Sequence, residues 1–192
     1  MSSTSDRPQP AAPEGLRERV AAWDRAVSSR IAVDWPNPRW LTVPVAAVSL
    51  TANYGILWFG LALIPWLAGA HLGWQRALYI GGSVLLTEVL TFCIKVAVGR
   101  RRPARLRSQP ADLIPVPRSR SFPSSHASMG MVGLLTAASL YPIWTLPLCA
   151  LVALLAFSRV YLRVHYVADV LAGLLFGAVV GAVVVASAGR LF

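Results

Sequence analysis

The segment SRVYLRVHYVAD, residues 158–169, lies between two stretches of almost pure Leu, Val, Ala and Gly. These stretches, residues 143–162 and 165–187, each match the roughly 20 apolar residues that a helix needs to cross a bilayer. Charged side chains next to such stretches are costly and are usually functional. The segment therefore indicates two membrane helices that bring arginine, histidine and aspartate side chains to one face of a membrane.

The composition of the whole chain is that of a membrane protein. Of its 192 residues, 56% are hydrophobic and only 14% are charged, whereas soluble domains contain about 25% charged residues. The net charge of +10 comes from 17 arginines and one lysine. In a membrane protein this excess indicates orientation and contact with anionic lipids. Nucleic acid is not an expected partner, because no basic, soluble, aromatic-rich segment is present.

The chain divides into a short tail and a single membrane domain, residues 14–192. Residues 1–13 are polar and proline-rich, lack the apolar core of a signal peptide, and are expected to be disordered. Residues 14–33 carry apolar residues every three or four positions among charged ones, which predicts an amphipathic helix on the membrane surface. The transmembrane core is predicted at 41–188, in hydrophobic runs at 41–69, 77–98, 124–141, 143–162 and 165–187.

These runs predict an all-α, polytopic transmembrane bundle of five to six membrane helices. The first run is too long for one straight helix, and we expect it to break near TANYG, residues 51–55, before it crosses. If each run crosses once, the ends of the second and fourth runs share a membrane face with the starts of the third and fifth. The polar residues of the core cluster at those four places.

The same count predicts the orientation. The N-terminus and the loop 99–123 also lie on the polar face, so 15 of the 17 arginines lie there, and only Arg76 and Arg190 lie opposite. Positively charged flanks favour the cytoplasm. We therefore expect a multi-pass protein of the plasma (inner) membrane with its polar site on the cytoplasmic side.

Within the opening segment, His165 and Asp169 are four residues apart and share a face if both are helical. A carboxylate bound to one imidazole nitrogen leaves the other nitrogen free to act as a nucleophile or base. The alternative is a pair that only satisfies its own hydrogen bonds at the start of a helix.

A second segment, FPSSH at residues 122–126, begins the third run. It places Ser124 at a predicted helix N-terminus, where free N–H groups bind anions, and His126 in the first turn. The alternative is an ordinary helix cap.

A third segment, KVAVGRRRP at residues 95–103, places Lys95 near the end of the second run and Arg102 before a proline. The residue before proline is excluded from helical geometry, so Arg102 is expected to turn back over the helix end. Arg100 and Arg101 are interpreted as topological anchors. Arg159, from the opening segment, adds another guanidinium suited to a tetrahedral anion.

Together these pieces place cations, a helix N-terminus and two histidines at one face, without a carboxylate cluster suited to a metal. A phosphate group fits this set best, because one histidine can attack phosphorus while the other protonates the departing oxygen. We expect neither a metal nor a cofactor.

The three segments also resemble the signature of the type 2 phosphatidic acid phosphatase superfamily, KxxxxxxRP, PSGH and SRxxxxxHxxxD, in order and spacing. The resemblance covers roughly residues 50–188. It implies that His165 is the nucleophile and forms a phosphohistidine, that Asp169 orients it, and that His126 is the general acid. It also implies a metal-free phosphate site, formed by Lys95, Arg102, Ser124 and Arg159.

One position departs from that signature. Ser125 stands where the family usually has glycine, whose lack of a side chain lets backbone N–H groups approach phosphate closely. We include Ser125 among the phosphate-binding residues, because its hydroxyl can add a hydrogen bond. Tighter geometry and altered substrate choice are the alternatives.

The predicted function is that of an integral membrane lipid phosphatase acting on a terminal phosphate monoester or diphosphate. A cytoplasmic site favours a biosynthetic intermediate, and decaprenylphosphoryl phosphoribose or a similar polyprenyl lipid is one candidate. Phosphatidylglycerol phosphate and undecaprenyl diphosphate are alternatives. Vanadate-dependent haloperoxidases share the motifs but resemble soluble helical proteins. A non-catalytic phosphate-binding membrane protein or transporter would not need two histidines and an aspartate.

Two further charged residues lie near the motifs. Arg163 is expected to face solvent or lipid, with contact to a substrate headgroup as the alternative. Glu88, two helical turns before Lys95 and deeper in the bilayer, is expected to hydrogen-bond a neighbouring helix.

Overall fold

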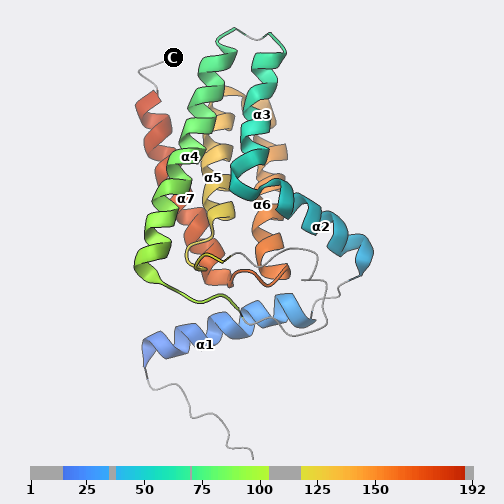
Figure 1. Cartoon of the computed structure of the whole chain (residues 1–192), viewed down its shortest axis with the longest axis vertical. Helices are drawn as coiled ribbons and strands as arrows, with labels where there is room; N and C mark the ends of the chain where they lie inside the picture. The colour runs from blue at the N-terminus through green and yellow to red at the C-terminus, as the bar shows by residue number, and fades with distance from the viewer. Residues whose placement is uncertain (1–14, 35–37, 70, 104–117, 189–192) are drawn as a thin grey trace, which may run out of the picture.

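The computed structural model describes residues 15–34, 38–69, 71–103 and 118–188, which form helices and turns without a strand. Helices α3 to α7 stand side by side, α2 leaves them obliquely, and α1 lies across one end (Figure 1). The expected disordered tail, residues 1–13, lies outside the described residues. The helices are α1 Leu16–Ser29, α2 Arg39–Thr51, α3 Ile56–Leu67, α4 Gly73–Val98, α5 Ser125–Leu140, α6 Thr145–Tyr161 and α7 Val167–Ala188.

Three segments in the described part of the chain are long and apolar enough to cross a membrane, namely Gly73–Val98, Pro142–Tyr161 and Val167–Ala188. Helices α2 and α3 qualify together as one broken span with a bend of 70°. A 3-10 turn at Asn53–Gly55 separates them, so the break predicted near TANYG is present. Helix α5 has 16 residues and is shorter than a span. The described residues therefore give three or four candidate spans and do not confirm five to six.

Glycines on one face of α7 decide how closely α5 and α7 pack. Gly173, Gly177 and Gly181 recur every four residues, and a Cβ atom at Gly173 would lie 2.6 Å from the carbonyl oxygen of Ser124. This spacing of small residues lets two membrane helices approach backbone to backbone. The N–H of Ser124 consequently donates a hydrogen bond of 2.9 Å to the carbonyl of Asp169, which joins the beginnings of the two helices.

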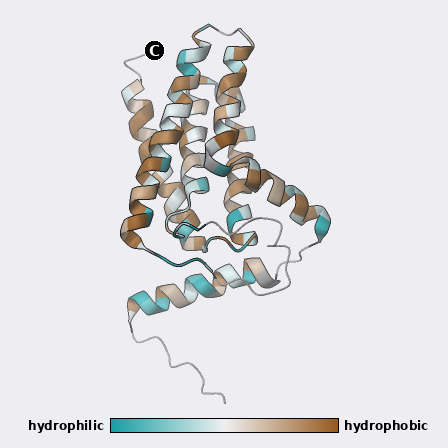
Figure 2. Cartoon of the chain, in the orientation of Figure 1, coloured by the Kyte–Doolittle hydropathy of each residue, from teal (hydrophilic) through white to brown (hydrophobic). Residues whose placement is uncertain are grey.

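The interior of the bundle is apolar away from this junction. Trp58, Val84, Met129 and Val132 form a buried cluster between α3, α4 and α5. The outward side chains Leu171, Leu175, Val179 and Val183 of α7 are apolar and more than half exposed. Figure 2 shows hydrophobic residues along most of the bundle helices. A helix exposed to water would carry polar residues there. The bundle surface therefore suits a lipid environment.

Helix α1 occupies most of the segment in which the sequence predicts a surface helix. Leu16, Val20 and Trp23 are exposed, whereas Asp24 and Ser28 are buried against the rest of the protein. The apolar face is thus free to contact lipid, although its location on a membrane surface stays a prediction. The burial of a charged residue on the inner face was not expected.

The turn between α6 and α7 is held by Arg163. This residue has a φ angle of 56°, which is rare for a residue other than glycine. Its Nε and Nη2 atoms donate to the carbonyl of Ala32 at 3.0 and 2.7 Å, and the residue is 5% exposed. The expectation that Arg163 faces solvent or lipid is therefore wrong, because a backbone carbonyl 131 residues away binds it.

Candidate active site

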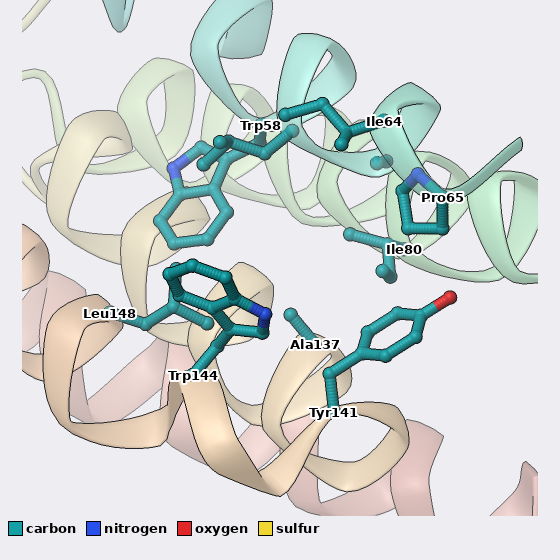
Figure 3. Close-up of a pocket in the computed structure, with 10 residues that line it drawn as sticks. Trp58, Ile64, Pro65, Ile80, Ala137, Tyr141, Trp144 and Leu148 are labelled. Atoms are coloured by element: carbon teal, nitrogen blue, oxygen red, sulfur yellow. The ribbon is translucent and has the colours of Figure 1, made fainter. Parts of the chain in front are cut away.

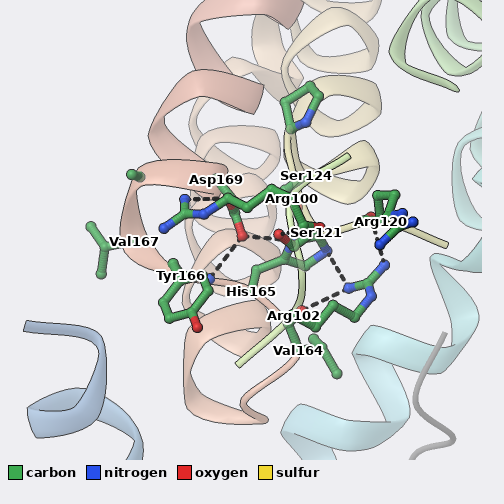
Figure 4. Close-up of polar contacts among 12 residues, drawn as sticks. Arg100, Arg102, Arg120, Ser121, Ser124, Val164, His165, Tyr166, Val167 and Asp169 are labelled. Atoms are coloured by element: carbon green, nitrogen blue, oxygen red, sulfur yellow. Dashed lines mark hydrogen bonds and ion pairs between the residues drawn. The ribbon is translucent and has the colours of Figure 1, made fainter. Parts of the chain in front are cut away.

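Polar side chains from four helices meet at the end of the bundle that α1 covers. Helices α4 and α6 end there, and α5 and α7 begin there (Figures 1 and 4). The structure thus gathers at one end the residues that the sequence assigned to one membrane face. Buried members of this set are Lys95, Ser124, Ser125, His126, Arg159, His165 and Asp169, and Arg102 is half-buried.

His165 and Asp169 approach each other, but not as two residues of one helix. His165 lies in the turn before α7, which begins at Val167, and Asp169 lies in the first turn of α7. Nδ1 of His165 is 3.5 Å from Oδ2 of Asp169. The same oxygen accepts a hydrogen bond of 3.0 Å from the N–H of Tyr166, which fixes the carboxylate beside the ring.

Arg102 lies on the other side of the His165 ring. Its Nη1 is 3.1 Å from Nε2 of His165 and donates to the carbonyl of Val164 at 2.7 Å, while Nε donates to the carbonyl of Ser119 at 2.8 Å (Figure 4). A guanidinium only donates hydrogen bonds, so Nε2 accepts and Nδ1 carries the ring proton towards Asp169. Burial lowers the pKa of Arg102 to about 10, so it stays cationic at neutral pH.

Lys95 and Arg159 are buried cations beside this pair. Nζ of Lys95 donates to the carbonyl of Pro123 at 2.7 Å, and Nη1 of Arg159 donates to Oγ of Ser49. Within the described residues, neither cation nor Arg102 has a carboxylate at ion-pair distance, and Nε of Arg159 has no hydrogen-bond partner. Buried cations require a compensating negative charge. The geometry therefore suits an anion.

The beginning of α5 contributes the second motif. Ser124 is at the N-cap position, and its Oγ has no partner among the residues described. Nε2 of His126, in the first turn, is 3.2 Å from the carbonyl oxygen of Ser49. Ser125 makes a side-chain hydrogen bond with Glu88, which confirms the predicted bond from Glu88 to a neighbouring helix. A phosphate contact of Ser125 stays a prediction.

Arg100 is more than the topological anchor that the sequence suggested. Its Nη1 is 2.6 Å from Oδ1 of Asp169, and its Nη2 is 2.6 Å from Oδ2 of Asp24. The guanidinium also lies 4.3 Å from the ring centroid of Tyr166. The anchor role of Arg100 stays a prediction, but it is incomplete, because the bundle and α1 each present a carboxylate to this residue. These carboxylates outweigh burial, so the pKa of Arg100 is raised.

Sequence reasoning missed Asp24, Ser49 and Ser121. Asp24 lies four residues after Val20 and three before Val27, at the edge of the apolar stripe of α1, which is a usable signal. Ser49 is a lone hydroxyl in an apolar run and gives only a weak signal. Ser121 is fully buried and hydrogen-bonds the Asp169 side chain, but nothing in its local sequence indicates that contact.

The surroundings of His165 favour its neutral form. Burial is the main cause, and the nearby Arg159 and Arg102 guanidinium groups add to it, so the pKa of His165 is well below its ordinary value. The imidazole therefore keeps a lone pair at neutral pH. In the described part of the chain, no group of three or more His, Cys, Asp or Glu side chains could hold a metal ion.

Comparisons with known proteins add to this geometry. The PAP2 superfamily profile matches residues 76–192. The solved structure of the first transmembrane PAP2-type phosphatidylglycerolphosphate phosphatase from Bacillus subtilis is similar, with a TM-score of 0.65 and 22% identity, over 91% of this chain and 88% of that one. Aquifex aeolicus LpxE has a TM-score of 0.69 and 21% identity, over 84% of this chain and 94% of that one. A comparison with curated proteins gave no match. At these identities the two structures show a shared fold.

Proposed function

The chain belongs to the PAP2 superfamily, and on that premise we propose that it is a membrane lipid phosphatase that works through a phosphohistidine. The observation that carries the proposal is the set of buried cations, Lys95 and Arg159 with the half-buried Arg102, without carboxylate partners among the described residues. Such a set is costly unless an anion joins it. The neutral His165 beside that set supports catalysis over binding alone.

In the first step, Nε2 of His165 attacks the phosphorus of the terminal phosphate. An N–P bond forms and the P–O bond to the lipid breaks. His126, which takes up a proton as the phosphate anion binds beside it, gives that proton to the departing oxygen. Arg102, which donates to Nε2, exchanges this contact for an oxygen of the phosphate. The ring becomes cationic as the N–P bond forms, and Asp169 stabilises that charge.

In the second step, water attacks the phosphohistidine. His126, now neutral, takes the proton of the water, the N–P bond breaks, and inorganic phosphate leaves with its oxygens held by the cations. His165 returns to its neutral state. The negative charge on the phosphoryl oxygens is stabilised by Lys95, by Arg159 and by the N–H groups at the beginning of α5. The proposed reaction uses no metal.

The substrate is a membrane lipid with a terminal phosphate, because the site lies where apolar helices end. The arginine-rich end of the bundle supports a cytoplasmic site and therefore a biosynthetic intermediate. A polyprenyl lipid such as decaprenylphosphoryl phosphoribose is the first candidate, with phosphatidylglycerol phosphate and undecaprenyl diphosphate as alternatives.

The test is phosphate release by detergent-purified protein over a panel of lipid phosphates, without added metal and with EDTA. Wild type, His165→Ala and the control His71→Ala are compared, because His71 is an exposed histidine in the loop at the opposite end. We expect wild type and the control to release phosphate in EDTA and His165→Ala to be inactive. Loss of release in EDTA, release by His165→Ala, or no release by any folded protein would overturn the proposal.

A further inference from the structure

Helix α1 caps the helix that carries Asp169. Oδ1 of Asp24 accepts the N–H of Ala168 at 2.9 Å, and Oγ of Ser28 accepts the N–H of Val167 at 2.9 Å. These are the first two residues of α7. Helix caps are usually supplied by the residue just before the helix. Here two side chains from the far end of the sequence bind the free N–H groups, and Asp24 adds a negative charge at the positive end of the helix.

The same aspartate reaches the catalytic pair through Arg100. The contacts run without a break from Asp24 to Arg100 at 2.6 Å, from Arg100 to Asp169 at 2.6 Å, and from Asp169 to His165 at 3.5 Å. Asp24 is 1% exposed and Asp169 is fully buried. Buried carboxylates and a guanidinium at these distances fix one another strongly.

The sharing of Arg100 has an electrostatic consequence. A guanidinium paired with Asp169 alone would neutralise the carboxylate that must stabilise a cationic His165. Asp24 supplies a second negative charge on the far side of Arg100, so the three groups together carry a net charge of about −1. Arg100 therefore holds Asp169 in place, and the net charge of Asp24, Arg100 and Asp169 beside His165 stays negative.

We propose that Asp24 is a positioning residue of the active site, which acts through Arg100 to orient Asp169 and to preserve its negative charge beside His165. The proposal rests on the proposed function. It assigns to α1 a role in catalysis that is separate from contact with the membrane. Asp24 lies outside the three motifs. Arg100 lies within the first motif, KxxxxxxRP, but at a position that the signature leaves open.

The test uses the protonation of His165 as its readout. Lowering the net negative charge near the ring disfavours its cationic form, and raising it favours that form. Charged and titratable groups face His165 from α4, α5, α6, α7 and the adjoining loop. These groups are Lys95, Arg102, His126, Arg159 and Asp169, with Arg100 and Asp24 behind Asp169. Groups that are not substituted affect the protonation of His165 in the same way in wild type and in the variants.

The experiment measures kcat and KM against pH for Asp24→Asn and Arg100→Gln in the full-length protein. We expect kcat of Asp24→Asn to fall about 10-fold with KM within about two-fold, because the lost interaction strengthens only as the ring becomes cationic. The acid limb is the fall of kcat/KM on the acid side of its pH profile. It should move to lower pH in Asp24→Asn and to higher pH in Arg100→Gln, each by on the order of half a pH unit.

Three controls separate positioning from simple attachment of α1. Ser28→Ala removes a contact to α7 and a 3.5 Å hydrogen bond to Oδ1 of Asp24 but leaves Arg100 unchanged, and Arg25→Gln and Arg101→Gln remove exposed charges from the same segments. All three should keep the acid limb of wild type. Equal effects of Ser28→Ala and Asp24→Asn on kcat, with no shift in pH, would show a merely structural role and overturn the proposal.

If Asp24→Asn does not fold, Arg100→Gln alone decides. An acid limb at higher pH than wild type supports the proposal, and an unchanged or lower limb overturns it. Failure of the proposed function is a different result, because it requires wild type to be inactive, inhibited by EDTA, or unaffected by His165→Ala.

Discussion

The two ends of the bundle are built from the same helices but differ in what they bury. At the end covered by α1, Lys95, Arg159 and His165 are at most 4% exposed. Towards the other end, residues of α3, α4, α5 and α6 line a partly open apolar cavity of about 280 Å³, in which Trp58 and Trp144 face each other in Figure 3. One end therefore holds desolvated charge, and the other holds aromatic and aliphatic side chains.

This difference separates function from stability. Burying a cation without a counter-charge costs stability, and proteins keep such groups where a ligand compensates them. Burying apolar side chains does the reverse, because it stabilises the fold and offers no chemistry. Substitutions at the site end should therefore reduce turnover and leave stability unchanged or higher. Substitutions at the cavity end should lower stability and leave turnover nearly unchanged.

After the complete loss expected for His165→Ala, the largest expected effect on turnover is that of His126→Gln. Loss of a general acid should lower kcat about 10²–10⁴-fold for a lipid phosphate, whose alkoxide leaves poorly without a proton. An aryl phosphate with an acidic phenol as leaving group should lose much less, and its hydrolysis by the same variant measures this difference. Equal losses for both substrates would mean that His126 has another role.

Arg159→Met should have the next largest effect. Removal of a cation from the phosphoryl oxygens should lower kcat/KM about 10²-fold, whereas the thermal unfolding temperature in detergent should be unchanged or higher. Arg76→Met is the matched control, because Arg76 stands 5.5 Å from the Tyr141 ring at the cavity end. A lower unfolding temperature for Arg159→Met would contradict the distinction between the two ends.

A third prediction concerns acid. The pKa of His165 is lower in the folded protein than in the unfolded chain, because of its burial and the neighbouring arginines. Its neutral form therefore stabilises the fold above the unfolded pKa of about 6.5, and this contribution is lost as the pH falls towards the folded value. Unfolding temperatures between pH 7 and pH 4.5 should fall less in His165→Asn than in wild type.

The control for that titration is His71→Asn at the other end, which should follow the wild-type curve. The same shift predicts that turnover by wild type persists below pH 6.5 and then falls about tenfold per pH unit below the folded pKa. Loss of activity already at pH 6.5 would mean that the ring is not held neutral.

The smallest effect on turnover should come from Trp58→Ala. Trp58 is 1% exposed, and its removal enlarges the cavity and should lower the free energy of unfolding by about 3–5 kcal/mol. Phosphate release by the folded variant should stay within about two-fold of wild type. Trp144→Ala, which removes a ring that is 59% exposed, should change neither quantity much.

The helices of the bundle could be predicted because the length of an apolar run is a local property. The break near residues 51–55 was also predictable, since the first run exceeds one span. The number of crossings was not. Helix α5 is shorter than its apolar run, and α2 bends away from α3 by 70°, and both outcomes depend on packing against other helices.

The motif residues could be placed because each lies at or next to a helix end, and α4 and α6 end where α5 and α7 begin. Arg100 could not be assigned from its neighbours, since a basic residue after a membrane helix usually only sets orientation. Its partners are 76 and 69 residues away. Arg163 was misassigned for the same reason, because the carbonyl that it binds is distant in sequence.

The contact between α1 and α7 joins the first and last described helices, so the candidate site becomes complete only late in the synthesis of the chain. Asp24 leaves the ribosome early, whereas Ala168, whose N–H it binds, follows 144 residues later. The nascent chain therefore carries the lysine and the first histidine of the site into the membrane well before their partners exist. The proposed catalytic pair can therefore assemble only after α7 has been made and has met α1.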